Sequence, residues 1–238
     1  MKATSAGGDG PLAARLAHRR LVVFDVDGTL YDQRRLRRAM AVRLLRHLAL
    51  TGRHSTLRAL RAYRRAREAT AEAESAEFEA EAIAAAARGG GLATEAARAL
   101  VADWMQARPL PLLRRCRYGG VAELFAALRR RGTTVGILSD YPAREKMRAL
   151  GLEADLVAAA GDPGVAVQKP HPAGLLHLME RAGAGPGETI LVGDRVDRDG
   201  AAGRRAGVAV LIRADRPAGP DAFRDFGLLL PGPDARAA

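Results

Sequence analysis

The sequence is poor in cysteine and in aromatic residues. Cys116 is the only cysteine among 238 residues, so an intramolecular disulfide is excluded and a cytoplasmic location is expected. Aromatic residues make up 4% of the chain and hydrophobic residues 48%, so the core has to be built mainly from aliphatic side chains. No apolar run reaches the length of a signal-peptide core or of a membrane span, and we therefore expect a soluble protein without a membrane partner.

Acidic residues are scarce between Arg34 and Glu68, where twelve arginines stand against one acid. The formal net charge of the whole chain is +11, an excess that can attract nucleic acid or steer small anions. Tyr63 is the only aromatic residue in this stretch, so platforms for the stacking of unpaired bases are missing. A solvated helix face is therefore the favoured interpretation, and nucleic acid is an unlikely partner on this pattern.

Short apolar runs alternate with helical patterns over most of the chain. The runs suit buried parallel strands and lie at residues 21–24, 134–138, 156–159, 189–192 and 208–212. Helical patterns occupy residues 121–131, 143–150, 172–182 and 200–206, and glycines end several of them as C-terminal caps do. This alternation predicts an α/β fold with a Rossmann-like, doubly wound parallel sheet.

One long interval interrupts this alternation. About 100 residues separate the first two expected strands, far more than a simple crossover needs. Helices are expected there at residues 33–50, 55–71, 76–87 and 94–107. Residues 33–113 are therefore interpreted as an inserted all-helical domain, with Pro109 and Pro111 stiffening a returning hinge. Residues 19–32 and 114–238 would form the core, and residues 1–18 a disordered head.

Polar side chains follow three of the expected strands at the edge where open parallel sheets bind ligands. These side chains are Asp25, Asp27, Ser139, Asp140 and Asp194. Lys169 lies in a loop before a helix and can reach the same edge, and Asp197 and Asp199 follow Asp194 in a glycine-rich turn.

Carboxylates gathered in this way would raise the pKa of at least one of them unless a cation neutralised the site. Oxygen ligands favour a hard cation, and Mg²⁺ is commonly held by a few carboxylates and a phosphate. With one ammonium and one hydroxyl in addition, the set predicts a site of phosphoryl transfer. Taken singly, the same residues could form a turn, a helix cap and a surface lysine, but their order and common position at strand ends favour a site.

The same segments resemble the four motifs of the haloacid dehalogenase-like hydrolase superfamily. FDVDGTL is similar to the first motif, ILSD to the second, QKPHP to the third and GDRVDRDGAAGRRAG to the fourth. The resemblance implies a Rossmann-like core with a helical cap domain, and a Mg²⁺-dependent phosphatase acting on a small phosphorylated metabolite. Dehalogenases of this superfamily lack an acid at the position of Asp27, so its presence favours phosphate esters.

The resemblance also implies a role for each matching residue. Asp25 would be the nucleophile that forms an aspartyl-phosphate, and Asp27 the general acid and base. Lys169 would offset charge on the phosphoryl group, while Ser139 and Asp140 would belong to the phosphate-binding motif, where Asn is more usual at the second position. The metal would be held by Asp25, the Asp27 backbone carbonyl and Asp194, with Asp199 as a supporting acid in preference to Asp197.

Two other functions stay open on the sequence. Phosphomutases of the same superfamily carry both acids of the first motif. A non-catalytic protein that binds anions or nucleic acid could use the same scaffold, although it would not need both Asp25 and Asp27. The sequence specifies neither the phosphate ester nor the oligomeric state.

Overall fold

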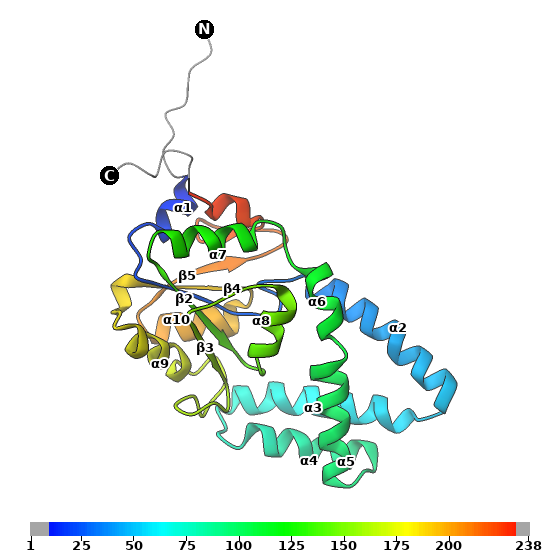
Figure 1. The fold of residues 1–238 in the computed structure, drawn as a ribbon. Coiled ribbons are helices and arrows are strands. Elements are labelled where there is room, and N and C mark those ends of the chain that lie inside the picture. The colour runs from blue at the N-terminus through cyan, green and yellow to red at the C-terminus, as the bar shows by residue number, and fades with distance from the viewer. Residues whose placement is uncertain (1–9, 232–238) are drawn as a thin grey trace.

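A six-stranded parallel sheet lies at the centre of the computed structural model, which describes residues 10–231 (Figure 1). The strands are β1 (Leu21–Phe24), β2 (Thr134–Ser139), β3 (Leu156–Ala159), β4 (Thr189–Gly193), β5 (Ala209–Arg213) and β6 (Ala222–Phe223). They are ordered β3-β2-β1-β4-β5-β6, and every neighbouring pair is parallel. The predicted α/β fold is confirmed, and β6 is a strand that the sequence pattern missed.

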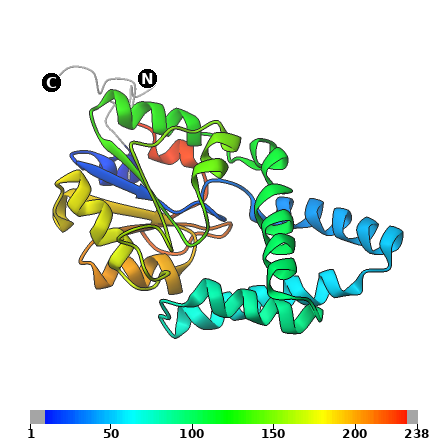
Figure 2. The ribbon, with the colours of Figure 1, turned by 60° about the horizontal axis from the view of Figure 1, so that its bottom comes forward.

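Helices cover both faces of the sheet, with α7 and α8 on one side and α9 and α10 on the other (Figures 1 and 2). The bounds are α1 (Pro11–Leu16), α7 (Val121–Arg130), α8 (Arg144–Leu150), α9 (Ala173–Ala182) and α10 (Ala201–Arg205), with shorter helical turns at Pro186–Glu188, Val196–Gly200 and Phe226–Leu229. Along β1, Val22 and Phe24 enter one apolar core while Leu21 and Val23 enter the other. Burial on both faces explains why this strand is apolar without alternation.

The chain between β1 and β2 forms a helical insertion, residues 33–116, that stands beside the sheet (Figure 2). Its helices are α2 (Gln33–Thr51), α3 (His54–Glu72), α4 (Phe78–Gly90), α5 (Thr94–Val101), a π-helical segment (Ala102–Ala107) and α6 (Leu110–Cys116). The all-helical character that the sequence predicts for this interval is confirmed. The insertion has a small core of its own, made largely of alanines around Tyr63 and Ile83.

Close contact between α3 and α4 explains two glycines near the end of α4. A Cβ atom on Gly89 would lie 2.6 Å from the Cβ of Ala62, and one on Gly90 would lie 2.9 Å from that of Ala59. Both glycines therefore belong to α4 and allow the two helices to approach. The helix ends at Gly91, which adopts a left-handed conformation with φ of 62°.

Two boundaries differ from the sequence-based predictions. Pro109 and Pro111 stand at the start of α6 rather than in a hinge. Proline is tolerated there because the amide groups of the first helical turn make no hydrogen bonds within the helix. Residues 11–16, predicted as part of a disordered head, form α1, whose Ala13 and Leu16 are buried. The rest of the predicted head up to residue 9, and residues 232–238, lie outside the described residues.

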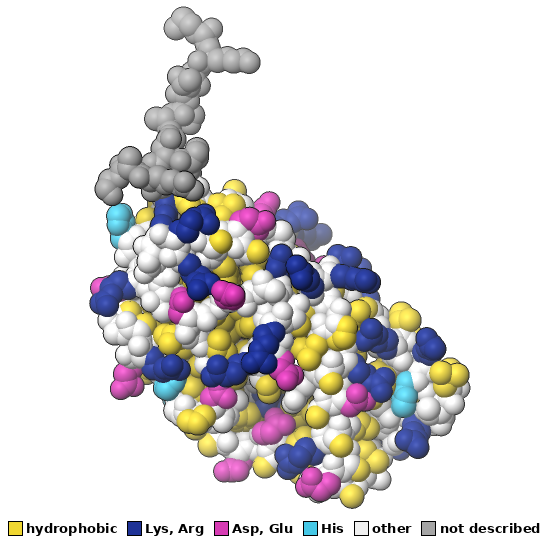
Figure 3. Space-filling view, in the orientation of Figure 1, with side chains coloured by type: hydrophobic (Ala, Val, Ile, Leu, Met, Phe, Trp, Pro, Cys, Tyr) yellow, Lys and Arg dark blue, Asp and Glu magenta, His cyan; other side chains and the backbone are white. Residues whose placement is uncertain are grey.

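Charged side chains connect the insertion to the core. Glu68 of α3 accepts hydrogen bonds from Arg195 at 3.0 Å and from Arg198 at 2.7 Å. Glu74, just beyond α3, pairs with Arg205 of α10. Basic side chains lie over both parts of the visible face with acidic ones between them (Figure 3). Within residues 10–231, no helix has the length and apolar character that a membrane span requires.

Candidate active site

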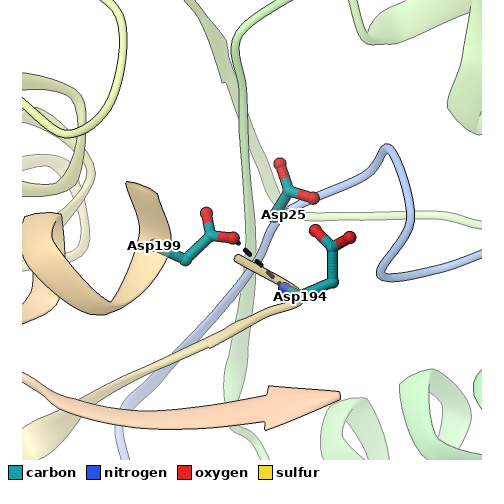
Figure 4. Close-up of side chains that lie close together, drawn as sticks. All are labelled: Asp25, Asp194 and Asp199. Carbon is teal, nitrogen blue, oxygen red and sulfur yellow. Dashed lines mark hydrogen bonds between the residues drawn. The ribbon is translucent and has the colours of Figure 1, made fainter. Parts of the chain in front are cut away.

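Four carboxylates and a lysine meet at the carboxyl edge of the sheet. Asp25 and Asp27 follow β1, Asp194 follows β4, Asp199 lies in the turn Val196–Gly200, and Lys169 comes from the loop before α9. Asp25, Asp194 and Asp199 offer carboxylate oxygens that all lie within 4.8 Å of one another (Figure 4). The structure therefore brings together the residues that the sequence placed at separate strand ends.

Lys169 is buried between two of these acids. Its Nζ donates to Asp25 Oδ1 at 2.5 Å and to Asp199 Oδ1 at 2.7 Å. Burial acts to lower the pKa of Lys169, but the Asp199 and Asp25 carboxylates outweigh it and raise that pKa well above its usual value. Lys169 is therefore a fixed ammonium inside the site.

The second oxygen of Asp199 is also occupied. It accepts hydrogen bonds from the backbone amides of Asp194 and Arg195, each at 3.1 Å. Asp199 thus holds Lys169 on one side and the loop that carries Asp194 on the other. Asp197, by contrast, is exposed and pairs with Arg195 at 2.7 Å, so it lies outside this network.

Asp25 has a partner for each carboxylate oxygen, because Thr29 Oγ1 donates to Oδ2 at 2.9 Å while Lys169 holds Oδ1. Burial is the main reason that the pKa of Asp25 is raised well above its usual value, with Lys169 opposing and the neighbouring acids adding to the shift. Burial and the Asp199 carboxylate likewise raise the pKa of Asp194 to about 6. The cluster carries more negative charge than Lys169 alone neutralises.

Two glycines allow the carboxylates to approach one another. Gly28 has φ of +100°, and a Cβ atom there would lie 2.2 Å from Asp194 Oδ2. A Cβ atom on Gly193 would lie 2.3 Å from the Cγ of Asp199. Glycine is needed at both positions because any side chain would displace an acid of the cluster.

Asp27 lies at the rim of the cluster and has two partners of its own. Lys146 of α8 donates to Asp27 at 2.5 and 2.7 Å, and the Tyr31 hydroxyl also donates to it. Burial acts to raise the pKa of Asp27, but Lys146 and then Tyr31 outweigh it and lower that pKa. Asp27 is therefore held as a carboxylate.

Sequence reasoning missed Lys146. The sequence does contain a signal for it, since Lys2, Lys146 and Lys169 are the only lysines in a chain whose other 35 basic residues, out of 38, are arginines. An ammonium is a compact point charge, whereas a guanidinium is a planar fork. Lys146 and Lys169, the two lysines within the described residues, each lie against a carboxylate of the site.

Ser139 and Asp140 take different positions beside the cluster. A cavity opens at the carboxylate cluster, called the catalytic cavity for its proposed role, and the Asp140 carboxylate lines it. Asp140 accepts a hydrogen bond from the Lys169 backbone amide at 2.9 Å, and burial raises its pKa. Ser139 is buried behind it, outside the residues that line the cavity, and its Oγ accepts from the Tyr141 amide at 3.2 Å. Their assignment to phosphate binding stays a prediction.

The helical insertion supplies one wall of this catalytic cavity, whose volume is about 120 Å³. Arg67 of α3 is buried and donates to the Asp140 backbone carbonyl and, at 2.7 Å, to Glu79. Its guanidinium lies 4.5 Å from the ring centroids of both Phe78 and Tyr141. Arg67 was not predicted, because one arginine among twelve in that stretch carries no distinguishing pattern.

The donor set fits a hard divalent cation. Asp25 is buried and Asp194 half-buried, and both have raised pKa values, as expected of carboxylates whose negative charge Lys169 alone does not balance. Oxygen ligands of this kind favour Mg²⁺ over softer metals. Asp199 is nearby, and its oxygens hold Lys169 and the backbone amides of Asp194 and Arg195, which suits a supporting acid.

Comparisons with known proteins agree with this geometry. Two curated phosphoglycolate phosphatases match, from Rhodospirillum rubrum (33% identity over 107 residues, 44% of each chain) and Xylella fastidiosa (36% over 98 residues, 40% of this chain and 42% of the relative). The match thus spans less than half the length of these relatives.

Solved structures with the same fold include a 2-haloacid dehalogenase from Pseudomonas syringae, with a TM-score of 0.62 and 20% identity over 89% of this chain and 96% of the other. The HAD-hydrolase YfnB from Bacillus subtilis, solved bound to magnesium, has a TM-score of 0.63 and 18% identity, and the match covers 89% of this chain and 99% of YfnB. Residues 19–207 match the sequence family described as haloacid dehalogenase-like hydrolase. The chain belongs to the haloacid dehalogenase-like hydrolase family.

Proposed function

We propose that this hydrolase is a Mg²⁺-dependent phosphatase that acts on a small phosphorylated metabolite through an aspartyl-phosphate. The observation that carries the proposal is the pairing of two acids with different environments at one cavity. Asp25 is held by Lys169 and Thr29, while Asp27 stands at the rim, held by Lys146. The match to phosphoglycolate phosphatases supports phosphate esters over halo-acids.

Asp25 would attack phosphorus, forming an oxygen–phosphorus bond while the bond to the leaving oxygen breaks. Lys169 lies against Asp25. It would offset the negative charge of the phosphoryl oxygens while the phosphoryl group is transferred to Asp25. Mg²⁺, held by Asp25, Asp194 and the Asp27 backbone carbonyl, would supply further neutralisation of that charge. Asp199 would keep Lys169 and the Asp194 loop in place.

Asp27 would give a proton to the leaving oxygen and then take one from the water that hydrolyses the aspartyl-phosphate. Lys146 lowers the pKa of Asp27, which favours the base required in the second step. A phosphate dianion in the cavity would raise the same pKa by like-charge repulsion, which favours the acid required in the first step. Having given that proton to the leaving oxygen, Asp27 would be the carboxylate that the second step needs.

The helical insertion would act as a cap. Arg67 already reaches from α3 to the Asp140 carbonyl, so the insertion closes the catalytic cavity and limits the entry of water. The ion pairs of Glu68 with Arg195 and Arg198 close the same boundary.

The test is Asp27→Asn, which keeps the backbone carbonyl but removes the titrating group. An aryl phosphate has a good leaving group and needs no proton, so Asp25 is expected to be phosphorylated with a burst of about one phenolate per site. The phosphoenzyme should then persist, because water lacks its base. Rapid-quench kinetics with mass spectrometry measures both quantities. Unchanged steady turnover on aryl and alkyl phosphates alike would refute the role of Asp27, and Asp197→Asn serves as the control because Asp197 lies outside the network.

A further inference from the structure

A second cavity adjoins the catalytic one and is larger. Its volume is about 320 Å³, against about 120 Å³ for the catalytic cavity. The two share lining residues, namely Asp27, Gln33, Arg37, Glu68 and Tyr141. In the proposed reaction Asp27 faces the leaving oxygen, so the second cavity lies where the leaving group has to go. We call it the leaving-group cavity.

Apolar side chains form much of the wall of this cavity. Leu36 and Met40 come from α2, Trp104 and Met105 from the π-helical segment, and Leu110 and Leu113 from α6. Water in such a space makes few hydrogen bonds, so an apolar group of matching size gains free energy by replacing it. The wall therefore selects a leaving group with an apolar body.

Two arginines give the same cavity an unmatched positive charge. Arg37 and Arg64 line it, and neither has an ion pair or hydrogen bond with any residue in the described part of the chain. Both side chains are partly exposed to solvent at the cavity. The loss of some hydration and the nearby charge of Arg37 lower the pKa of Arg64. Glu68, one turn after Arg64 on α3, is engaged by Arg195 and Arg198 instead. An anionic group on the ligand would relieve the repulsion.

We propose, on the basis of the phosphatase function above, that the substrate is an organic phosphate whose leaving alcohol carries an apolar body of about the size of a phenyl ring and a second anionic group. The apolar body would lie against Met105 and Trp104, and the anion would lie at Arg37 and Arg64. Glycolate supplies the anion but no apolar body, so phosphoglycolate would leave most of this cavity unfilled.

The kinetic test uses three alkyl phosphates with alcohol leaving groups: ethyl phosphate, benzyl phosphate and 4-carboxybenzyl phosphate. Benzyl phosphate is expected to exceed ethyl phosphate in kcat/KM by about 10-fold or more, because a buried phenyl ring contributes that much. The carboxylate of 4-carboxybenzyl phosphate should raise kcat/KM by a further factor of about three to five, because it interacts with Arg37 and Arg64. Phosphoglycolate, measured alongside, should fall below 4-carboxybenzyl phosphate.

Variants locate these two effects. Met105→Asp places a carboxylate in the apolar wall at a half-buried position and should remove most of the benzyl preference. Leu45→Asp is the matched control, because Leu45 of α2 is 65% exposed and does not line the cavity. Arg64→Gln should remove most of the gain from the carboxylate. Arg61→Gln removes the same charge from another exposed position of α3, one that does not line the cavity, and should leave this gain unchanged.

Binding measurements separate this inference from the phosphatase function. Ethylphosphonate, benzylphosphonate and 4-carboxybenzylphosphonate cannot be hydrolysed, and their affinities can be measured by titration calorimetry in buffer containing MgCl₂. Failure to hydrolyse any of the esters would refute the phosphatase function, whereas the calorimetric order would still test the cavity. Equal affinities of the benzyl and ethyl phosphonates, or a benzyl preference that Met105→Asp leaves intact, would overturn the inference.

Discussion

Replacing Lys146 by methionine isolates the electrostatic interaction that holds Asp27. The substitution removes an ammonium that lies 2.5 and 2.7 Å from the two Asp27 oxygens and keeps a chain of similar length. Unit charges about 4 Å apart interact by about 4 kcal/mol at an effective dielectric constant of about 20, which corresponds to about three pKa units. The Tyr31 hydroxyl still donates to Asp27 and keeps part of the stabilisation of its charge, so we expect the pKa of Asp27 to rise by less than the full loss of Lys146 would give.

The effect on stability depends on pH. In the native protein the lowered pKa of Asp27 contributes stability above the unfolded value of 3.8, and that contribution is lost as the pH falls through the folded value. In Lys146→Met the pKa of Asp27 in the folded state is raised instead. Folding then becomes less favourable as the pH rises above 3.8, because Asp27 has to ionise without a partner. The loss in unfolding free energy should therefore widen between pH 4 and pH 7, reaching about 3 kcal/mol, the usual cost of breaking a buried ion pair.

Urea denaturation at several pH values measures this difference. Arg148→Met removes one positive charge from an exposed position on the same helix and should show little change at any pH. Asp27→Asn in the Lys146→Met background should recover much of the lost stability, because no buried charge then lacks a partner. A loss for Lys146→Met that stayed constant from pH 4 to pH 7 would refute the reasoning.

Three further outcomes follow from the site. Mg²⁺ affinity should fall by up to about tenfold per pH unit below pH 6, where Asp194 takes up a proton. Asp194→Asn should weaken binding and reduce this pH dependence in calorimetric titrations, with the remainder due to Asp25, whose pKa is also raised. Chelation should abolish activity. Gly28→Ala should abolish activity, while Gly132→Ala, also at positive φ but with open space around it, should lower stability by about 1 kcal/mol and retain activity. Arg67→Gln should lower the unfolding free energy by about 2 kcal/mol and raise KM, because the Asp140 carbonyl loses its donor; an unchanged KM would argue against a cap role.

The sequence predicts the order and nature of most core elements because strands buried on both faces leave a continuous apolar signal, as in β1 and β4. It also places Asp25, Asp194 and Lys169 at one edge, since parallel strands end together there. Lys146 escaped prediction because its contact with Asp27 is set by how α8 packs, 119 residues away in the chain. The two residues of β6 are too few to show any periodicity.

The ion pairs between the insertion and the core have a kinetic consequence. The side chain of Glu68 is 54% exposed to solvent. Those of Arg195, Glu74 and Arg205 are between 32% and 42% exposed. Pairs of this kind contribute at most about 1 kcal/mol each and are screened over about 8 Å at physiological ionic strength. In the proposed cap role, the insertion is therefore held partly by exposed pairs that separate easily, beside the buried bonds of Arg67 and Arg198. Turnover paced by cap opening would quicken as salt is added, even where salt slows the capture of an anionic ester.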